Sequence, residues 1–136
     1  MRKSFNHGYV VVRQVYRPEH NAAAPIGVIA FDSEKKAWAV RLIRIDETIP
    51  FGVKVNHILI QVFARQMLDL SQETKSRVRT PWNSECWRYL SKQMTSTLQL
   101  DVPKAFARSE GLTIEVEAEK MFQEIVRPVL SRPPVH

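Results

Sequence analysis

The stretch PIGVIAFDSEKKAWAVRLIRI, residues 25–45, contains two apolar runs rich in β-branched and aromatic residues. The first run ends at Asp32, and the four polar residues SEKK at 33–36 separate it from the second run, which begins at Ala37. Two such runs on either side of a short polar connection are typical of an antiparallel β-hairpin. This hairpin is the element around which the rest of the chain can be arranged.

Side chains along a strand alternate between the two faces of the sheet. In the second strand of the predicted hairpin, one face carries Trp38, Val40 and Leu42, and the other carries Ala39, Arg41 and Ile43. The face that carries Arg41 is therefore expected to meet solvent or a partner.

Two further regions extend the predicted sheet. The segment YVVVRQVY at residues 9–16 has strand composition and ends before Pro18, so residues 8–45 are predicted to form a three-stranded antiparallel meander. Apolar and polar residues also alternate in STLQLDVP at 96–103, and the segment GLTIEV at 111–116 is a candidate for a short strand.

Three segments have helical patterns. Asn56 can cap a helix over residues 57–70, and Thr80 followed by Pro81 marks the start of a second helix that continues to about Met94. The third covers residues 117–126, and Pro128 is expected to limit its extension. The helix over 57–70 is expected to pack on the sheet through a wide apolar face formed by Ile58, Leu59, Val62, Phe63, Met67 and Leu70.

The predicted fold class is therefore α+β, an antiparallel sheet packed on one face against two or three helices. Residues 1–127 form a single domain, and residues 128–136 form a proline-rich tail that is loose or extended.

The overall composition predicts a soluble protein. A chain of 136 residues with 44% hydrophobic positions can bury a core of its own, and no apolar run approaches the length of about 20 residues that spans a membrane. The single cysteine cannot form an internal disulfide, and no secretory leader is recognisable, so a cytoplasmic location is expected. The net charge of +6 favours anionic partners, but the charges are spread along the chain rather than gathered in an arm.

Familiar catalytic and cofactor-binding patterns do not occur in the sequence. The four histidines, His7, His20, His57 and His136, are scattered and have no CxxC or HxxxH companions, and no glycine-rich phosphate loop or serine nucleophile elbow is present. We therefore expect no catalytic residue, no cofactor and no metal, although an enzyme of unrecognised type stays an alternative.

A thiol and a group of carboxylates could be reactive, but both have simpler structural interpretations. Cys86 falls on one helical stripe with Leu90 and Met94, beside Trp87, which favours a core position over a reactive thiol. The carboxylates of Glu115, Glu117 and Glu119 resemble an acid/base group, but alternation in a strand that runs into a helix is expected to place some of them on a solvated face.

One surface is a candidate for binding a partner. It combines alternating positive charges in the segment before the second helix with an aromatic residue and two further charges along that helix: Lys75, Arg77, Arg79, Trp82, Arg88 and Lys92. Such a group can bind an acidic protein surface or nucleic-acid phosphates, and Trp82, which precedes the helix body, could stack on a base. No recognised nucleic-acid-binding motif accompanies these charges.

The order of the segments resembles the bacterial family known as domain of unknown function 3037. The resemblance lies in YVVVRQVYRP at 9–18, PIGVIAFDSEKK at 25–36, STLQLDVPKAF at 96–106 and EAEKMFQEIV at 117–126. It implies a small companion or regulatory subunit of a kinase-like or toxin-like partner, and it carries no catalytic residues onto this chain. The function predicted from the sequence is thus a non-catalytic protein-interaction or regulatory module, with nucleic-acid binding as the alternative.

Overall fold

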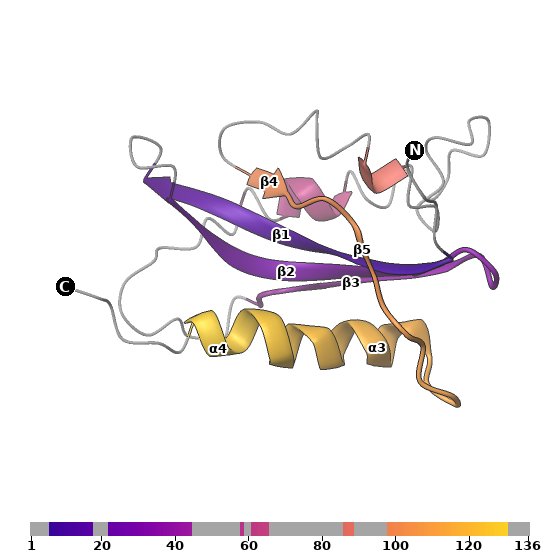
Figure 1. Cartoon of the computed structure of the whole chain (residues 1–136). Helices are drawn as coiled ribbons and strands as arrows, with labels where there is room; N and C mark the ends of the chain where they lie inside the picture. The colour runs from indigo at the N-terminus through magenta and orange to yellow at the C-terminus, as the bar shows by residue number, and fades with distance from the viewer. Residues whose placement is uncertain are drawn as a thin grey trace.

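The computed structural model describes residues 6–17, 22–44, 58, 61–65, 86–88 and 98–130. The first three strands are β1 (His7–Arg17), β2 (Ala22–Asp32) and β3 (Ala37–Leu42), and the later two are β4 (Leu98–Leu100) and β5 (Lys104–Ala105). The C-terminal helical segment consists of α3 (Ile114–Met121), η3 (Phe122–Val126) and α4 (Arg127–Leu130). The predicted α+β class is confirmed (Figure 1).

The five strands form one antiparallel sheet. The strand order is β3-β2-β1-β4, and β5 also pairs with β1. Since β4 pairs with residues 12–14 of β1 and β5 pairs with residues 8 and 9, the two short strands share one edge of the sheet. The three-stranded meander predicted from the sequence is confirmed, as is the strand within residues 96–103.

The β2–β3 hairpin closes through the polar turn at residues 33–36. The buried carboxylate of Asp32 accepts a hydrogen bond from the backbone N–H of Lys35 at 3.1 Å. Lys36 adopts a left-handed backbone with φ of 50°, which returns the chain into β3. The side chain of the last residue of β2 therefore stabilises the turn that follows it.

Gly27 allows β2 and β3 to approach closely. A Cβ atom at this position would lie 2.5 Å from Cδ2 of Leu42, 3.0 Å from the carbonyl oxygen of Arg41 and 3.2 Å from Cα of Leu42. Gly27 and Leu42 are directly opposite each other in the β2–β3 register. Glycine is thus the residue that fits this pairing.

The C-terminal segment begins as a helix earlier than its sequence suggests. Thr113 caps α3, and its hydroxyl oxygen accepts a hydrogen bond from the N–H of Val116 at 3.3 Å. Ile114, Glu117, Ala118 and Met121 are buried at helical spacing. The short strand proposed for residues 111–116 is therefore wrong, because the alternation there coincides with the first turn of a capped helix.

Pro128 does not end this helix. The backbone N–H of Arg127 donates to the carbonyl oxygen of Phe122, five residues earlier, and the widened turn over Phe122–Val126 leads directly into α4. A proline in an ordinary helix clashes with the carbonyl four residues before it, and a wider turn relieves that crowding. The expectations that the helix stops before Pro128 and that residues 128–130 are loose or extended are both wrong.

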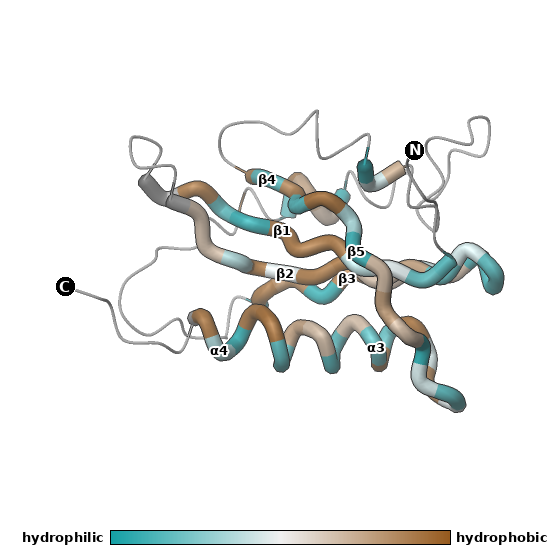
Figure 2. The backbone as a smooth tube through the Cα atoms, in the orientation of Figure 1, coloured by the Kyte–Doolittle hydropathy of each residue, from teal (hydrophilic) through white to brown (hydrophobic). Residues whose placement is uncertain are grey.

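Helical residues lie on both faces of the sheet, rather than on one as expected (Figure 1). On one face, the C-terminal helix packs against β2 and β3. On the other face, the ring of Trp38 lies 6.1 Å from that of Trp87, whose side chain is fully buried in the same core as Phe63. Figure 2 shows the apolar stretches of β1 and β2 between these layers.

Arg41 lies beneath the C-terminal helix. Its guanidinium carbon is 3.9 Å from the centre of the Phe122 ring, its Nε donates to a carboxylate oxygen of Glu119, and its Nη1 donates to the carbonyl oxygen of Leu42 at 2.8 Å. The expectation that this face of β3 meets solvent or a partner is wrong, because the chain's own helix covers the face and supplies a carboxylate and an aromatic ring for the cation.

The other predicted helices are described only in part. Ile58, residues 61–65 and residues 86–88 are helical. Phe63 is buried as expected, but Ile58 and Val62 are 77% and 50% exposed, so the apolar face of this helix is narrower than predicted.

Candidate functional site

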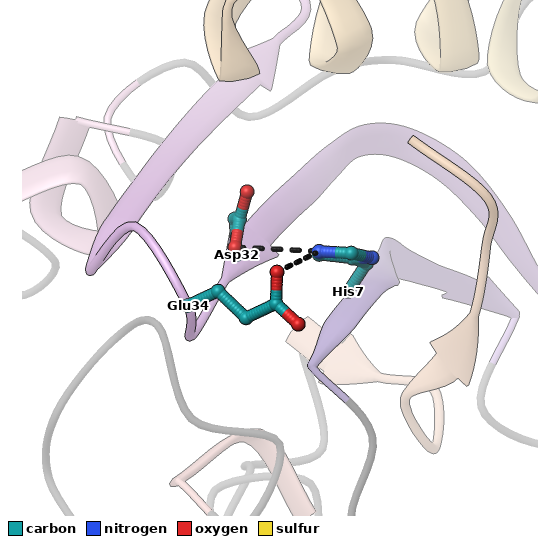
Figure 3. A group of neighbouring side chains, drawn as sticks. All are labelled: His7, Asp32 and Glu34. Carbon is teal, nitrogen blue, oxygen red and sulfur yellow. Dashed lines mark ion pairs between the residues drawn. The ribbon is translucent and has the colours of Figure 1, made fainter. Parts of the chain in front are cut away.

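Three side chains with metal-ligating atoms meet at the turn end of the β2–β3 hairpin: His7, Asp32 and Glu34. His7 and Asp32 are paired across β1 and β2, and Glu34 lies in the turn that follows β2. The Nε2 atom of His7 lies 3.5 Å from Oδ1 of Asp32 and 3.5 Å from Oε2 of Glu34 (Figure 3). Register and turn together bring His7 beside two carboxylates that lie 25 and 27 positions later in the chain, and this group is called the hairpin-end cluster below.

Other contacts orient both carboxylates of the hairpin-end cluster. Oδ2 of Asp32 lies 3.4 Å from Nε of Arg108, on the side away from His7. Oε1 of Glu34 accepts a hydrogen bond from Nδ2 of Asn6 at 2.9 Å. In each carboxylate one oxygen lies beside a neighbouring donor and the other lies near the imidazole, and Oδ1 of Asp32 also accepts a hydrogen bond from the N–H of Lys35.

The three side chains of the hairpin-end cluster differ widely in their exposure to solvent. The side chain of Asp32 is 2% exposed, whereas those of His7 and Glu34 are 27% and 59% exposed. The buried Asp32 anchors the group, and Glu34 is its most exposed member.

The outer edge of β3 is a second feature with binding capacity. The N–H of Ile43 donates to the carbonyl oxygen of Ile26 at 2.8 Å. Ile43 therefore occupies a hydrogen-bonded position opposite β2, and this determines which residues of β3 are hydrogen-bonded to β2. In an antiparallel pair, hydrogen-bonded and non-hydrogen-bonded positions alternate. The backbone groups that point away from β2 therefore belong to Trp38, Val40 and Leu42.

No strand among the described residues pairs with this outer edge, which we call the β3 edge. The carbonyl oxygen of Leu42 is engaged by Arg41, as described above. Among the described residues, no strand pairs with the outward backbone groups of Trp38 and Val40, so these groups can accept a further strand.

The structure describes only one of the basic and aromatic residues that the sequence proposes as a binding surface. Arg88 lies in the helical residues 86–88 and is half-buried. The other five, Lys75, Arg77, Arg79, Trp82 and Lys92, lie outside the described residues. Their grouping stays a prediction.

Cys86 and the three glutamates at positions 115, 117 and 119 take part in packing or internal contacts or face solvent, and they do not form a reactive site. Cys86 and Trp87 are fully buried, which confirms the core interpretation of that helix. Oε1 of Glu117, a residue only 2% exposed, accepts a hydrogen bond from the backbone N–H of Ser109 at 2.8 Å, so Glu117 is not among the solvated glutamates. Glu119 binds Arg41 and Glu115 is exposed, so the three glutamates do not converge on one acid/base site.

Sequence reasoning missed the hairpin-end cluster because it searched for ligands close together in the chain. The available signal was indirect: Asp32 and Glu34 flank Ser33 in the turn, and His7 begins the neighbouring strand. Only the pairing of β1 with β2 places the histidine opposite Asp32.

No helix in the described ranges is long and apolar enough to cross a lipid bilayer. The chain matched no family model, no curated protein and no solved structure in the three comparisons. The resemblance to domain of unknown function 3037 stays a prediction from the sequence.

Proposed function

We propose that this chain is a non-catalytic protein-interaction module of the bacterial cytoplasm that binds an extended segment of a protein partner along the β3 edge. The carrying observation is the alternation of the β2–β3 ladder, which directs the backbone of Trp38 and Val40 away from β2. An extended peptide can add a strand to such an edge, and main-chain hydrogen bonds then supply much of its affinity.

The β3 edge is held in place from both faces of the sheet. Arg41 is fixed beneath the C-terminal helix by Glu119 and Phe122. On the opposite face, Trp38 packs against Trp87. A strand fixed in this way loses little conformational freedom when a partner strand pairs with it, which lowers the entropic cost of binding.

The composition of β3 also favours pairing. Its six residues, AWAVRL, include no proline and no lysine, the residues that commonly protect an edge strand against pairing. Its one charged residue, Arg41, points inward, which is another feature of protected edges, but here the guanidinium is already paired with Glu119. The kinase-like or toxin-like partner implied by the family resemblance is the first candidate for the incoming segment.

The test uses two variants of one residue. Val40→Pro removes an outward N–H and leaves the ladder with β2 intact, because Val40 sits at a position that donates no hydrogen bond to β2. Val40→Thr keeps the N–H and the β-branched shape and serves as the matched control. Each tagged protein is purified from its native host under mild salt, with and without nuclease, and the retained proteins are identified by mass spectrometry.

We expect a protein that is retained by the parent chain and by Val40→Thr, and that binds Val40→Pro at least about tenfold more weakly, since proline removes a donor and places its ring at the edge. Amide exchange at Trp38 and Val40 should also slow in the complex. Equal retention by Val40→Pro and Val40→Thr, with both variants folded, would dismiss the β3 edge as the binding surface. Absence of any retained protein would remove support for an interaction module altogether.

Nucleic-acid binding remains the alternative, and it rests on the basic group around Arg77 and Arg79 together with the net charge of +6. Binding of that kind weakens steeply with salt and does not depend on the N–H of Val40. The nuclease-treated arm separates the two functions, because nuclease removes partners that are held through nucleic acid.

A further inference from the structure

We propose that His7, Asp32 and Glu34 bind a divalent transition-metal cation, with Zn²⁺ as the best-fitting ion. The donor set is one imidazole nitrogen and two carboxylate oxygens that all lie within 4.8 Å of one another. The imidazole distinguishes this group from a cluster of carboxylates alone, because nitrogen donors favour Zn²⁺ and its neighbours over Mg²⁺ and Ca²⁺.

The spacing of the donor atoms suits a small tetrahedral ion. Nε2 of His7 is 3.5 Å from each of its two oxygen neighbours. Atoms at two corners of a tetrahedron with that edge lie about 2.1 Å from its centre, which is the usual distance of Zn²⁺ from nitrogen and oxygen ligands. Three protein ligands leave a fourth position for water or another group.

The same spacing is poor for a direct hydrogen bond. Charge-assisted N–H···O bonds are about 2.7–2.9 Å long, and Nε2 of His7 is well beyond that from both oxygens. The imidazole nitrogen thus lies equally far from two carboxylates without a hydrogen bond to either. The three atoms thus leave a position between them at which an ion could contact all three.

Outer contacts hold the ligands in a binding geometry. Nδ2 of Asn6 donates a hydrogen bond to Oε1 of Glu34, which leaves Oε2 directed toward the centre of the group. Arg108 lies at Oδ2 of Asp32, and the N–H of Lys35 uses one lone pair of Oδ1, which leaves the second lone pair for a metal. Such outer partners orient metal ligands and raise affinity.

The charges and the exposure permit an ion to enter. Two carboxylates outweigh the single guanidinium of Arg108, so the group carries net negative charge. Glu34 is largely exposed, and it gives an ion a route from solvent to the buried Asp32. A bound ion would tie the first residue of β1 to the turn of the β2–β3 hairpin.

The test is a calorimetric titration of the full chain with Zn²⁺, repeated with Mg²⁺, and a titration with Co²⁺ followed by its visible absorption. Glu34→Gln and His7→Gln each remove one ligand, and Glu115→Gln removes an equal charge from an exposed position on α3 as the matched control. Thermal unfolding of every variant without metal establishes that it is folded. Asp32 is left unchanged because its contacts with Lys35 and Arg108 support the fold.

We expect one Zn²⁺ per chain, binding of Mg²⁺ at least about tenfold weaker, and an absorption spectrum typical of tetrahedral Co²⁺. Glu34→Gln and His7→Gln should each lower Zn²⁺ affinity at least about tenfold, whereas Glu115→Gln should leave it unchanged. Undiminished Zn²⁺ binding by His7→Gln would overturn the assignment and place the ion elsewhere on the chain. Lack of stoichiometric binding by the parent chain would overturn it as well.

Discussion

Replacing Gly27 with alanine should destabilise the fold, although the change adds only one methyl group. The new Cβ atom would lie 3.0 Å from the carbonyl oxygen of Arg41 and 3.2 Å from Cα of Leu42, and both of these are backbone atoms. Leu42 Cδ2 at 2.5 Å can move aside by rotation of its side chain, but the backbone contacts yield only if β2 and β3 separate. The substitution therefore acts directly on the pairing of the hairpin.

The expected magnitude follows from two opposing effects. Overpacking by a single group in a close contact costs about 1–3 kcal/mol. The lower entropy of the unfolded chain with alanine in place of glycine offsets about 0.4–1 kcal/mol, because Gly27 does not require a left-handed backbone. The two ranges combine to a net loss in the free energy of unfolding of about 0–2.6 kcal/mol, and their midpoints give about 1.3 kcal/mol. For a chain of 136 residues a loss of about 1.3 kcal/mol lowers the Tm by about 4–5 °C.

Urea unfolding followed by tryptophan fluorescence measures this loss, since Trp87 lies in the core and the partly buried Trp38 packs against it. The double variant Gly27→Ala with Leu42→Ala separates the two sources of crowding. Its loss in the free energy of unfolding should be at least about 0.5 kcal/mol smaller than the sum of the losses of the two single variants, because removal of the leucine side chain relieves part of the clash. A Gly27→Ala protein as stable as the parent would refute the close approach of the strands.

Two further predictions concern buried polar and thiol groups. Glu117→Ala should lower the free energy of unfolding by about 1–3 kcal/mol, because the N–H of Ser109 loses its acceptor. Glu117→Gln retains an acceptor oxygen and should lower the free energy of unfolding by less, and urea unfolding of both variants checks this. The thiol of Cys86, whose side chain is fully buried, should resist a water-soluble thiol reagent in the folded protein and react in denaturant, and rapid labelling of the folded protein would contradict its core position.

The sheet could be predicted because its signals are local. The β-branched runs and the polar turn at residues 33–36 specify the hairpin without reference to the rest of the chain. The start of the C-terminal helix is different, since Ile114 and Val116 alternate with glutamates as they would in a strand. The capping hydroxyl of Thr113 and the burial of Ala118 and Met121 decide for a helix, and burial depends on tertiary contacts.

The hairpin-end cluster could not be predicted for a related reason. Its residue types are ordinary, and its meaning comes from the register that places His7 opposite Asp32. A shift of that register by one residue would move the imidazole to the other face of the sheet. Metal-binding motifs describe ligands that are close together in the sequence, so they do not detect ligands that strand pairing brings together.

The position of Arg41 bears most directly on how this domain could bind a partner. From the sequence, the face of β3 that carries this residue is expected to meet solvent or a partner, yet the C-terminal helix covers it and pairs the guanidinium with Glu119 and Phe122. Trp87 covers Trp38 on the opposite face. Elements of the described part of the chain pack on both faces of β3, although five of its six residues keep partial exposure, and a partner strand would pair with it in the plane of the sheet. Backbone hydrogen bonding at Trp38 and Val40 is the interaction available from that direction, and for this reason a proline at Val40 is a sharper test than any change of side chain.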